Sequence, residues 1–131
     1  MENRHRLALV VVLGLFAVVP ATAHAQAATP LPTGVTQAMV DQGKVIFGGK
    51  GLCYACHGKA GEGLLGPTTK LANHDWIHSK GTYPEIVAYV KSGVTAEQSK
   101  SGQMMPPRGG STITDEEVNQ VAAYVYVISR K

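Results

Sequence analysis

Residues 51 to 63 read Gly-Leu-Cys-Tyr-Ala-Cys-His-Gly-Lys-Ala-Gly-Glu-Gly, and residues 53 to 57 within this stretch form a C-x-x-C-H motif. Two thiols three positions apart on a helical turn can each form a thioether with a porphyrin vinyl group, and the histidine that follows then points its imidazole at the iron. The motif therefore predicts one covalently attached haem c on Cys53 and Cys56, with His57 as the first ligand of the haem iron.

Three other interpretations of the two cysteines remain open from the motif itself. A C-x-x-C pair is half of many zinc sites, although this sequence has no second pair. A redox-active dithiol would need a βαβ setting, and no strand-like alternation is present. A structural disulfide suits an oxidising compartment but does not require the adjacent histidine. The haem interpretation accounts for all three residues of the motif.

The N-terminus has the pattern of an export signal. Arg4 and Arg6 precede an uncharged apolar run over residues 7 to 19, and several A-x-A cleavage sequences follow. The run is shorter than the roughly 20 residues of a membrane-spanning helix. We therefore expect residues 1 to 25 to be removed by cleavage near Ala25 and the mature protein to be periplasmic, without a stable membrane span. The alternative is an uncleaved anchor helix.

A chain of 131 residues has room for one domain. Residues 26 to 35 contain two prolines and no apolar periodicity, so we expect a flexible lead-in before a single domain over residues 36 to 131. The formal charge of the chain, +3, falls to +2 without the signal, and the basic residues are scattered. This distribution gives no support to nucleic-acid binding. The lysines in the loops flanking the haem motif and the methionine pair could still steer an acidic protein partner; they are Lys50, Lys59, Lys70 and Lys100.

Three helices are expected, and each has recognisable ends. Thr36 is a suitable N-cap for a helix that runs to about Gly48. A second helix lies between Gly81 and Gly93, and a third begins near Thr114. The later two start with capping boxes, formed by Thr82 with Glu85 and by Thr114 with Glu117. Apolar residues of the third helix recur at three- and four-residue steps, at Val118, Val121, Ala122, Val125 and Ile128.

The pattern predicts an all-α fold of three to four short helices joined by long loops. Loops of this length, rich in glycine and proline, would ordinarily count against a compact domain. A haem enclosed by these loops would supply the missing buried apolar surface, since a small domain gains little from its own core.

An electron carrier usually has a second axial ligand, which is a methionine or a histidine. Met104 and Met105 lie in a non-periodic loop bounded by glycine and proline, whereas Met39 is on the first expected helix. His74 and His78 are alternatives if their stretch is helical. Polar partners for the haem propionates could come from the indole of Trp76 and from Arg108.

The chain resembles a class I monohaem cytochrome c over roughly residues 38 to 128. The similarity is carried by Cys53 to Gly58, by the glycines of residues 61 to 63, by Gly66-Pro67, by Met105-Pro106-Pro107 and by Ala123-Tyr124 in the last helix. The resemblance implies the cytochrome c fold, with the first and last helices crossing near a right angle. Gly43 and Phe47 would then meet the segment around Tyr124.

The resemblance also implies the ligand set. Met105, standing directly before Pro106, matches the axial ligand of the family, and the Pro67 carbonyl would accept a hydrogen bond from His57. Proline also pushes the residue before it into an extended conformation, which favours Met105 over the adjacent Met104 on physical grounds.

The expected function is single-electron transfer rather than enzyme catalysis. We expect a monomeric carrier of a respiratory or other periplasmic redox chain, which exchanges electrons with one redox protein as donor and another as acceptor. One alternative is a haem subunit bound permanently to a dehydrogenase or a terminal oxidase. A haem peroxidase or gas sensor is a further alternative, and it would require an open coordination position on the iron.

Overall fold

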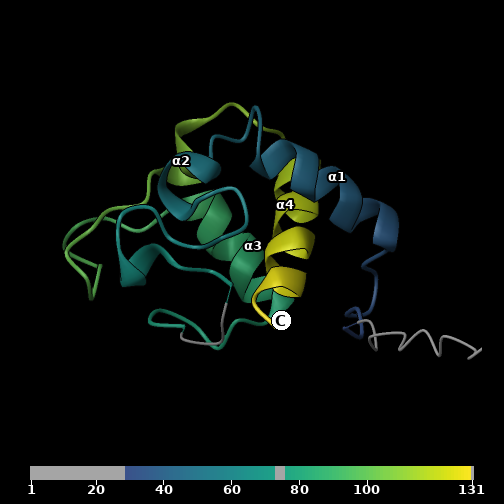
Figure 1. Cartoon of the computed structure of the whole chain (residues 1–131), viewed down its shortest axis with the longest axis horizontal. Coiled ribbons are helices and arrows are strands. Elements are labelled where there is room, and N and C mark those ends of the chain that lie inside the picture. The colour runs from purple at the N-terminus through teal and green to yellow at the C-terminus, as the bar shows by residue number, and fades with distance from the viewer. Residues whose placement is uncertain (1–28, 73–75, 131) are drawn as a thin grey trace, which may run out of the picture.

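The computed structural model describes residues 29 to 72 and 76 to 130. It contains four α-helices, α1 (Gln37–Phe47), α2 (Tyr54–His57), α3 (Tyr83–Ser92) and α4 (Asp115–Ile128), and two 3-10 turns, η1 (Pro67–Thr69) and η2 (Pro107–Gly110). Within these residues there is no sheet, only an isolated antiparallel bridge between Val94 and Met105. The predicted all-α fold class is confirmed (Figure 1).

The expected export signal, residues 1 to 25, lies outside the described residues. No helix of the described part of the chain has the length and apolar character needed to cross a membrane. The end of the expected lead-in is packed: Val35 is buried, Leu31 lies against the core, and the Val35 N–H donates to the Pro32 carbonyl at 3.0 Å. The packed chain therefore begins a few residues before Thr36.

The helices start at the predicted caps. Thr36 caps α1 through its hydroxyl. At α3, a Glu85 carboxylate oxygen accepts the Thr82 N–H at 3.0 Å. At α4 the bonds are reciprocal: the Thr114 hydroxyl accepts the Glu117 N–H at 3.3 Å, and Glu117 accepts the Thr114 N–H at 2.9 Å. These side chains satisfy backbone N–H groups that a helix start would otherwise leave without partners.

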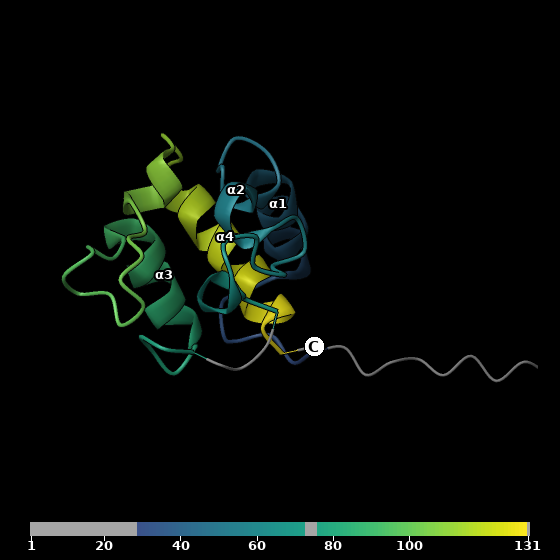
Figure 2. The same cartoon turned by 60° about the vertical axis from the view of Figure 1, so that its left-hand side comes forward.

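Helix α4 lies between α1 and α3, and it packs on both (Figure 2). Because it has neighbours on two sides, its buried surface is wider than one amphipathic stripe, and Ala123 and Tyr124 are buried as well as the predicted apolar positions. The residues of α4 that are buried are Val118, Val121, Ala122, Ala123, Tyr124, Val125 and Ile128. This helix is the centre of the hydrophobic core.

The contact between α1 and α4 is closest at Gly43. A Cβ atom at residue 43 would overlap the Gln120 carbonyl oxygen, and it would lie 2.5 Å from the carbonyl carbon of Gln120 and 3.1 Å from the Tyr124 Cβ. One turn further along α1, the rings of Phe47 and Tyr124 meet edge to face, with centroids 5.2 Å apart. The predicted meeting of Gly43 and Phe47 with the Tyr124 segment is confirmed.

Candidate functional site

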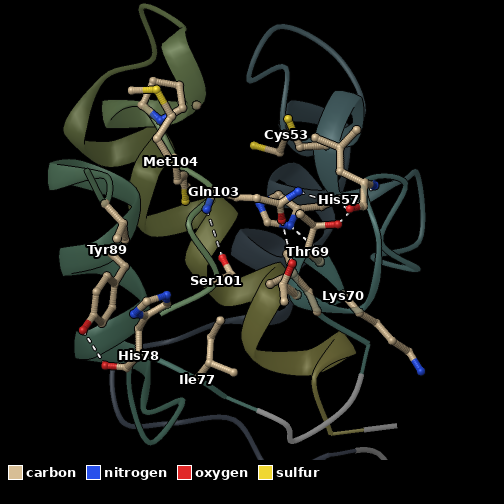
Figure 3. A pocket seen from close by; sticks show the side chains of 18 of the residues that line it. Cys53, His57, Thr69, Lys70, Ile77, His78, Tyr89, Ser101, Gln103 and Met104 are labelled. Atoms are coloured by element: carbon tan, nitrogen blue, oxygen red, sulfur yellow. Dashed lines mark hydrogen bonds between the residues drawn. The ribbon is translucent and has the colours of Figure 1, made fainter. Parts of the chain in front are cut away.

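A cleft opens beside α2 and is bounded on its other side by the segment from Val94 to Pro106. Its empty volume is about 1080 Å³, including the part open to solvent. Figure 3 shows Cys53 and His57 on one side of the cleft, with Met104 and Tyr89 on the other. All the predicted haem-binding residues line this cleft: Cys53, Cys56, His57 and Met105.

The cysteines and the histidine are brought together by the single turn of α2. The His57 N–H donates to the Cys53 carbonyl at 3.0 Å, and the Cys56 N–H donates to the same carbonyl at 3.3 Å. Residues three and four apart share one face of a helix, so this turn directs both sulfurs and the imidazole to the cleft. The cysteine sulfurs are not joined in a disulfide; Cys53 is buried and Cys56 is exposed.

The orientation of His57 is fixed by a backbone carbonyl. Its Nδ1 lies 2.6 Å from the Thr69 carbonyl oxygen and donates to it, which leaves Nε2 as the nitrogen able to bind a metal. The prediction that the Pro67 carbonyl accepts this hydrogen bond is wrong. Residues 67 to 69 form the turn η1, in which the Pro67 carbonyl accepts the Lys70 N–H at 3.2 Å, and the Thr69 carbonyl faces the imidazole instead.

Burial sets the protonation of two of these groups. It lowers the pKa of His57, although the hydrogen bond to Thr69 acts in the opposite direction, so the imidazole is neutral and has a free lone pair at physiological pH. Burial raises the pKa of the Cys53 thiol to about 11, so the free thiol stays protonated and uncharged at physiological pH. Neutral imidazole is the form of histidine that binds iron.

The opposite wall contains the two methionines, which differ in their surroundings. Met104 is 65% exposed, whereas Met105 is partly buried against the core. Met105 also lines an adjoining apolar pocket, the inner pocket, which His57 lines as well; its empty volume of about 410 Å³ includes space open to solvent, and Met104 does not line it. The bridge between Val94 and Met105 fixes the backbone of this wall.

The inner pocket is bounded by apolar side chains from three helices. They are Phe47 of α1, Ile86, Tyr89 and Val90 of α3, and Val121 and Val125 of α4. The apolar periodicity of the last helix predicted Val121 and Val125 as core positions, but it did not connect them with the haem site. Tyr89 was missed altogether, although its position three residues after Ile86 was a signal that it extends the same face of α3.

One polar side chain connects the two walls. The Thr68 hydroxyl donates to Gln103 Oε1 at 2.6 Å, and Gln103 Nε2 donates to the Leu65 carbonyl at 3.2 Å. Gln103 thus links the segment from Val94 to Pro106, here called the methionine segment, to the loop that also contains Thr69, the partner of His57. No sequence signal indicates this link, because an isolated glutamine in a polar loop has no pattern.

The remaining predicted site residues are distributed unevenly. Trp76 and His78 line the cleft, but residues 76 to 80 are not helical, and His74 lies outside the described residues. The His78 carbonyl accepts a hydrogen bond from the Tyr89 hydroxyl at 2.5 Å.

The Arg108 guanidinium, suggested as a propionate partner, instead donates to the Ile113 carbonyl at 2.7 Å and pairs with Asp115. Met39 packs against the core on α1 and does not line the cleft.

The cleft fits a haem c. Two sulfurs and a neutral imidazole face it from one turn, a thioether faces it from the other wall, and the deeper part is lined by apolar side chains. This donor set is the one that c-type haem requires. Among residues 29 to 72 and 76 to 130, no three His, Cys, Asp or Glu side chains gather as a separate metal site.

The chain is similar to a known protein family and to a solved structure. Residues 38 to 125 match the sequence model of the family described as cytochrome c oxidase, cbb3-type, subunit III. The chain is also similar to the crystal structure of cytochrome cL from the marine methylotrophic bacterium Methylophaga aminisulfidivorans, with 23% sequence identity and a TM-score of 0.43. This second match covers 70% of the present chain and 53% of that protein, so it spans about half the length of cytochrome cL.

Proposed function

Since the chain belongs to the cytochrome c oxidase cbb3-type subunit III family and is a monohaem c-type cytochrome, we propose that it is a periplasmic carrier of single electrons that holds its haem iron between His57 and Met105. The observation that carries the proposal is one cleft lined by Cys53, Cys56 and His57 on one wall and by Met105 on the other. The proposed roles are thioether attachment by Cys53 and Cys56 and axial ligation by His57 and Met105.

When bound, a haem c supplies an iron that gains one electron from a donor protein and loses it to an acceptor. The chain's own residues keep the geometry of that iron constant. Thr69 holds the imidazole of His57 in one orientation and tautomer through the bond to Nδ1. The apolar inner pocket, with Phe47 and Val121 among its residues, would give a bound haem apolar surroundings of low dielectric.

The choice of Met105 over Met104 is supported by burial. Met105 lines both the cleft and its inner pocket, whereas Met104 is largely exposed. Met105 also precedes Pro106, which restricts its backbone to extended conformations. A ligand needs a fixed direction, and Met105 has more of the contacts that provide one.

The test is a set of optical spectra on the purified protein. A pyridine haemochrome assay should report haem with two thioether bonds, and the ferric protein should show a sulfur-to-iron charge-transfer band. Met105→Ala should remove that band, lower the reduction potential and let the ferrous protein bind carbon monoxide. Met104→Ala, the matched control in the same loop, should do none of these. A band that survives Met105→Ala and disappears in Met104→Ala would assign the ligand to Met104.

The wild-type spectrum also separates the carrier from an enzyme or gas sensor. An iron with two protein ligands should bind carbon monoxide slowly or not at all, whereas an open position binds it at once. Immediate and complete binding by the wild-type ferrous protein would contradict the proposal and favour a peroxidase or sensor.

A second candidate function is favoured by the family description, which names an oxidase subunit. In that case the protein would be held permanently on a terminal oxidase and would receive electrons for it. A free carrier should sediment as a monomer after extraction at low salt, whereas a subunit should co-purify with haem-containing membrane proteins in a fixed ratio. Salt-resistant co-purification in a fixed ratio would overturn the free-carrier proposal.

A further inference from the structure

The C-terminal end of α3 meets the backbone of the methionine segment. Helix α3 ends at Ser92, and Gly93 caps it with φ 67° and ψ −167° while donating its N–H to the Tyr89 carbonyl at 2.9 Å. These angles lie in a region that essentially only glycine adopts. The chain therefore leaves α3 in a direction that a side-chain-bearing residue at position 93 would not readily allow.

The next residue bonds directly to the predicted ligand. The Val94 N–H donates to the Met105 carbonyl at 2.8 Å, and the Met105 N–H donates to the Val94 carbonyl at 2.8 Å. Both backbone polar groups of Met105 are thus used in one isolated bridge. Because α3 packs on α4, this bridge connects the backbone of Met105 to the core of the domain rather than to another loop.

Gly93 is also a site of close approach. A Cβ at residue 93 would overlap the Met105 carbonyl oxygen, and it would lie 2.7 Å from the Pro107 nitrogen and 2.8 Å from the Pro106 carbonyl carbon. All three neighbours are backbone atoms, so no side-chain rotation can make room. A methyl group at this position must displace the Met105 to Pro107 backbone or the end of α3.

From these contacts we infer that Gly93 and the bridge from Val94 are positioning elements for the Met105 sulfur: they fix the backbone from which the sulfur reaches the iron. This inference rests on the proposed ligand role of Met105. Groups that orient a metal ligand commonly change its metal affinity by roughly 10- to 100-fold when they are altered. Gln103 holds this segment two residues before Met105, whereas the α3 end holds the backbone of Met105 itself.

The test compares Gly93→Ala with Gly102→Ala in the haem-loaded protein. Gly102 is a matched control, because it also has a positive φ, 74°, and lies three residues before Met105. A Cβ at Gly102 would nevertheless meet nothing within 4 Å. Gly93→Ala should lose at least half of the ferric sulfur-to-iron band and should bind carbon monoxide about 10-fold or more faster in the ferrous state. Gly102→Ala should keep the wild-type band and the wild-type rate.

Each outcome is informative. Equal bands in the two glycine variants and the wild type would overturn the positioning role. If Met105→Ala itself leaves the band unchanged, the proposed ligand is wrong, which is a separate failure. Should Gly93→Ala fail to accumulate, hydrogen exchange in the wild-type protein decides the question. The Val94 and Met105 amides should be protected as strongly as amides within α3 and much more strongly than that of Gln103; exchange as fast as at Gln103 would overturn the inference.

Discussion

Replacement of Gly43 by alanine should destabilise the domain strongly, although alanine is the better helix former. In a helix the exchange ordinarily gains about 1 kcal/mol. Here the new methyl group would overlap the Gln120 carbonyl oxygen and lie 2.5 Å from the carbonyl carbon. Since both atoms belong to the backbone of α4, relief requires separation of the two helices.

Separation would also loosen the edge-to-face contact of Phe47 with Tyr124, whose centroids are 5.2 Å apart. Overpacking of a tight core costs roughly 1 to 3 kcal/mol and occasionally more. Because backbone atoms cannot rotate away, we expect a clash with them to cost about 3 kcal/mol, the upper end of that range. After the gain in helix propensity is subtracted, we expect a net loss of about 2 kcal/mol. This corresponds to a decrease in Tm of roughly 8 to 16 °C for a domain of this size. Gly43→Val should cost more.

The assay is urea unfolding of the haem-loaded protein followed by far-ultraviolet circular dichroism, with Gly48→Ala as the control. Gly48 ends the same helix with φ −83°, and a Cβ there would meet only the Lys44 carbonyl oxygen at an ordinary 3.5 Å. The control should be neutral or slightly stabilising. A Gly43→Ala variant as stable as the wild type would show that the two helices do not approach each other as closely as described.

Haem attachment should be a condition for folding, so Cys56→Ser should accumulate poorly; a well-folded, haem-free variant by circular dichroism would contradict this. Gln103→Ala should speed cyanide binding to the ferric protein, because it removes the link between the two walls; an unchanged rate would argue against that link. Hydrogen bonds from Lys91 and Arg108 lower the pKa of Asp115, so their contribution to stability is present above the ordinary carboxyl pKa of about 3.9 and is lost as the pH falls through the lower folded value. Asp115→Asn should therefore flatten the acid side of the stability profile, and an identical profile would exclude this role. Electron transfer to an acidic partner should slow as salt rises, since charges are screened beyond about 8 Å at physiological ionic strength; salt-independent rates would favour apolar docking.

Features formed by residues close together in the sequence, such as the haem motif and the helix caps, could be predicted from the sequence. The C-x-x-C-H motif is read within one turn, and its three side chains do share the cleft. The capping pairs at Thr82 with Glu85 and at Thr114 with Glu117 lie where the helices begin, because a cap acts over three residues. The contact of Gly43 with α4 followed from the resemblance to a known family, not from any local pattern.

Only the tertiary structure decided which distant groups meet. It assigned Thr69 rather than Pro67 as the partner of His57, because the turn η1 rotates the Pro67 carbonyl toward Lys70. It also joined Gly93 and Val94 at the end of α3 to the backbone of Met105, eleven residues further along the chain than Val94. Composition and periodicity carry no information about such contacts, since the carbonyl or N–H that a loop presents depends on its backbone path, and that path is fixed by packing against the rest of the domain.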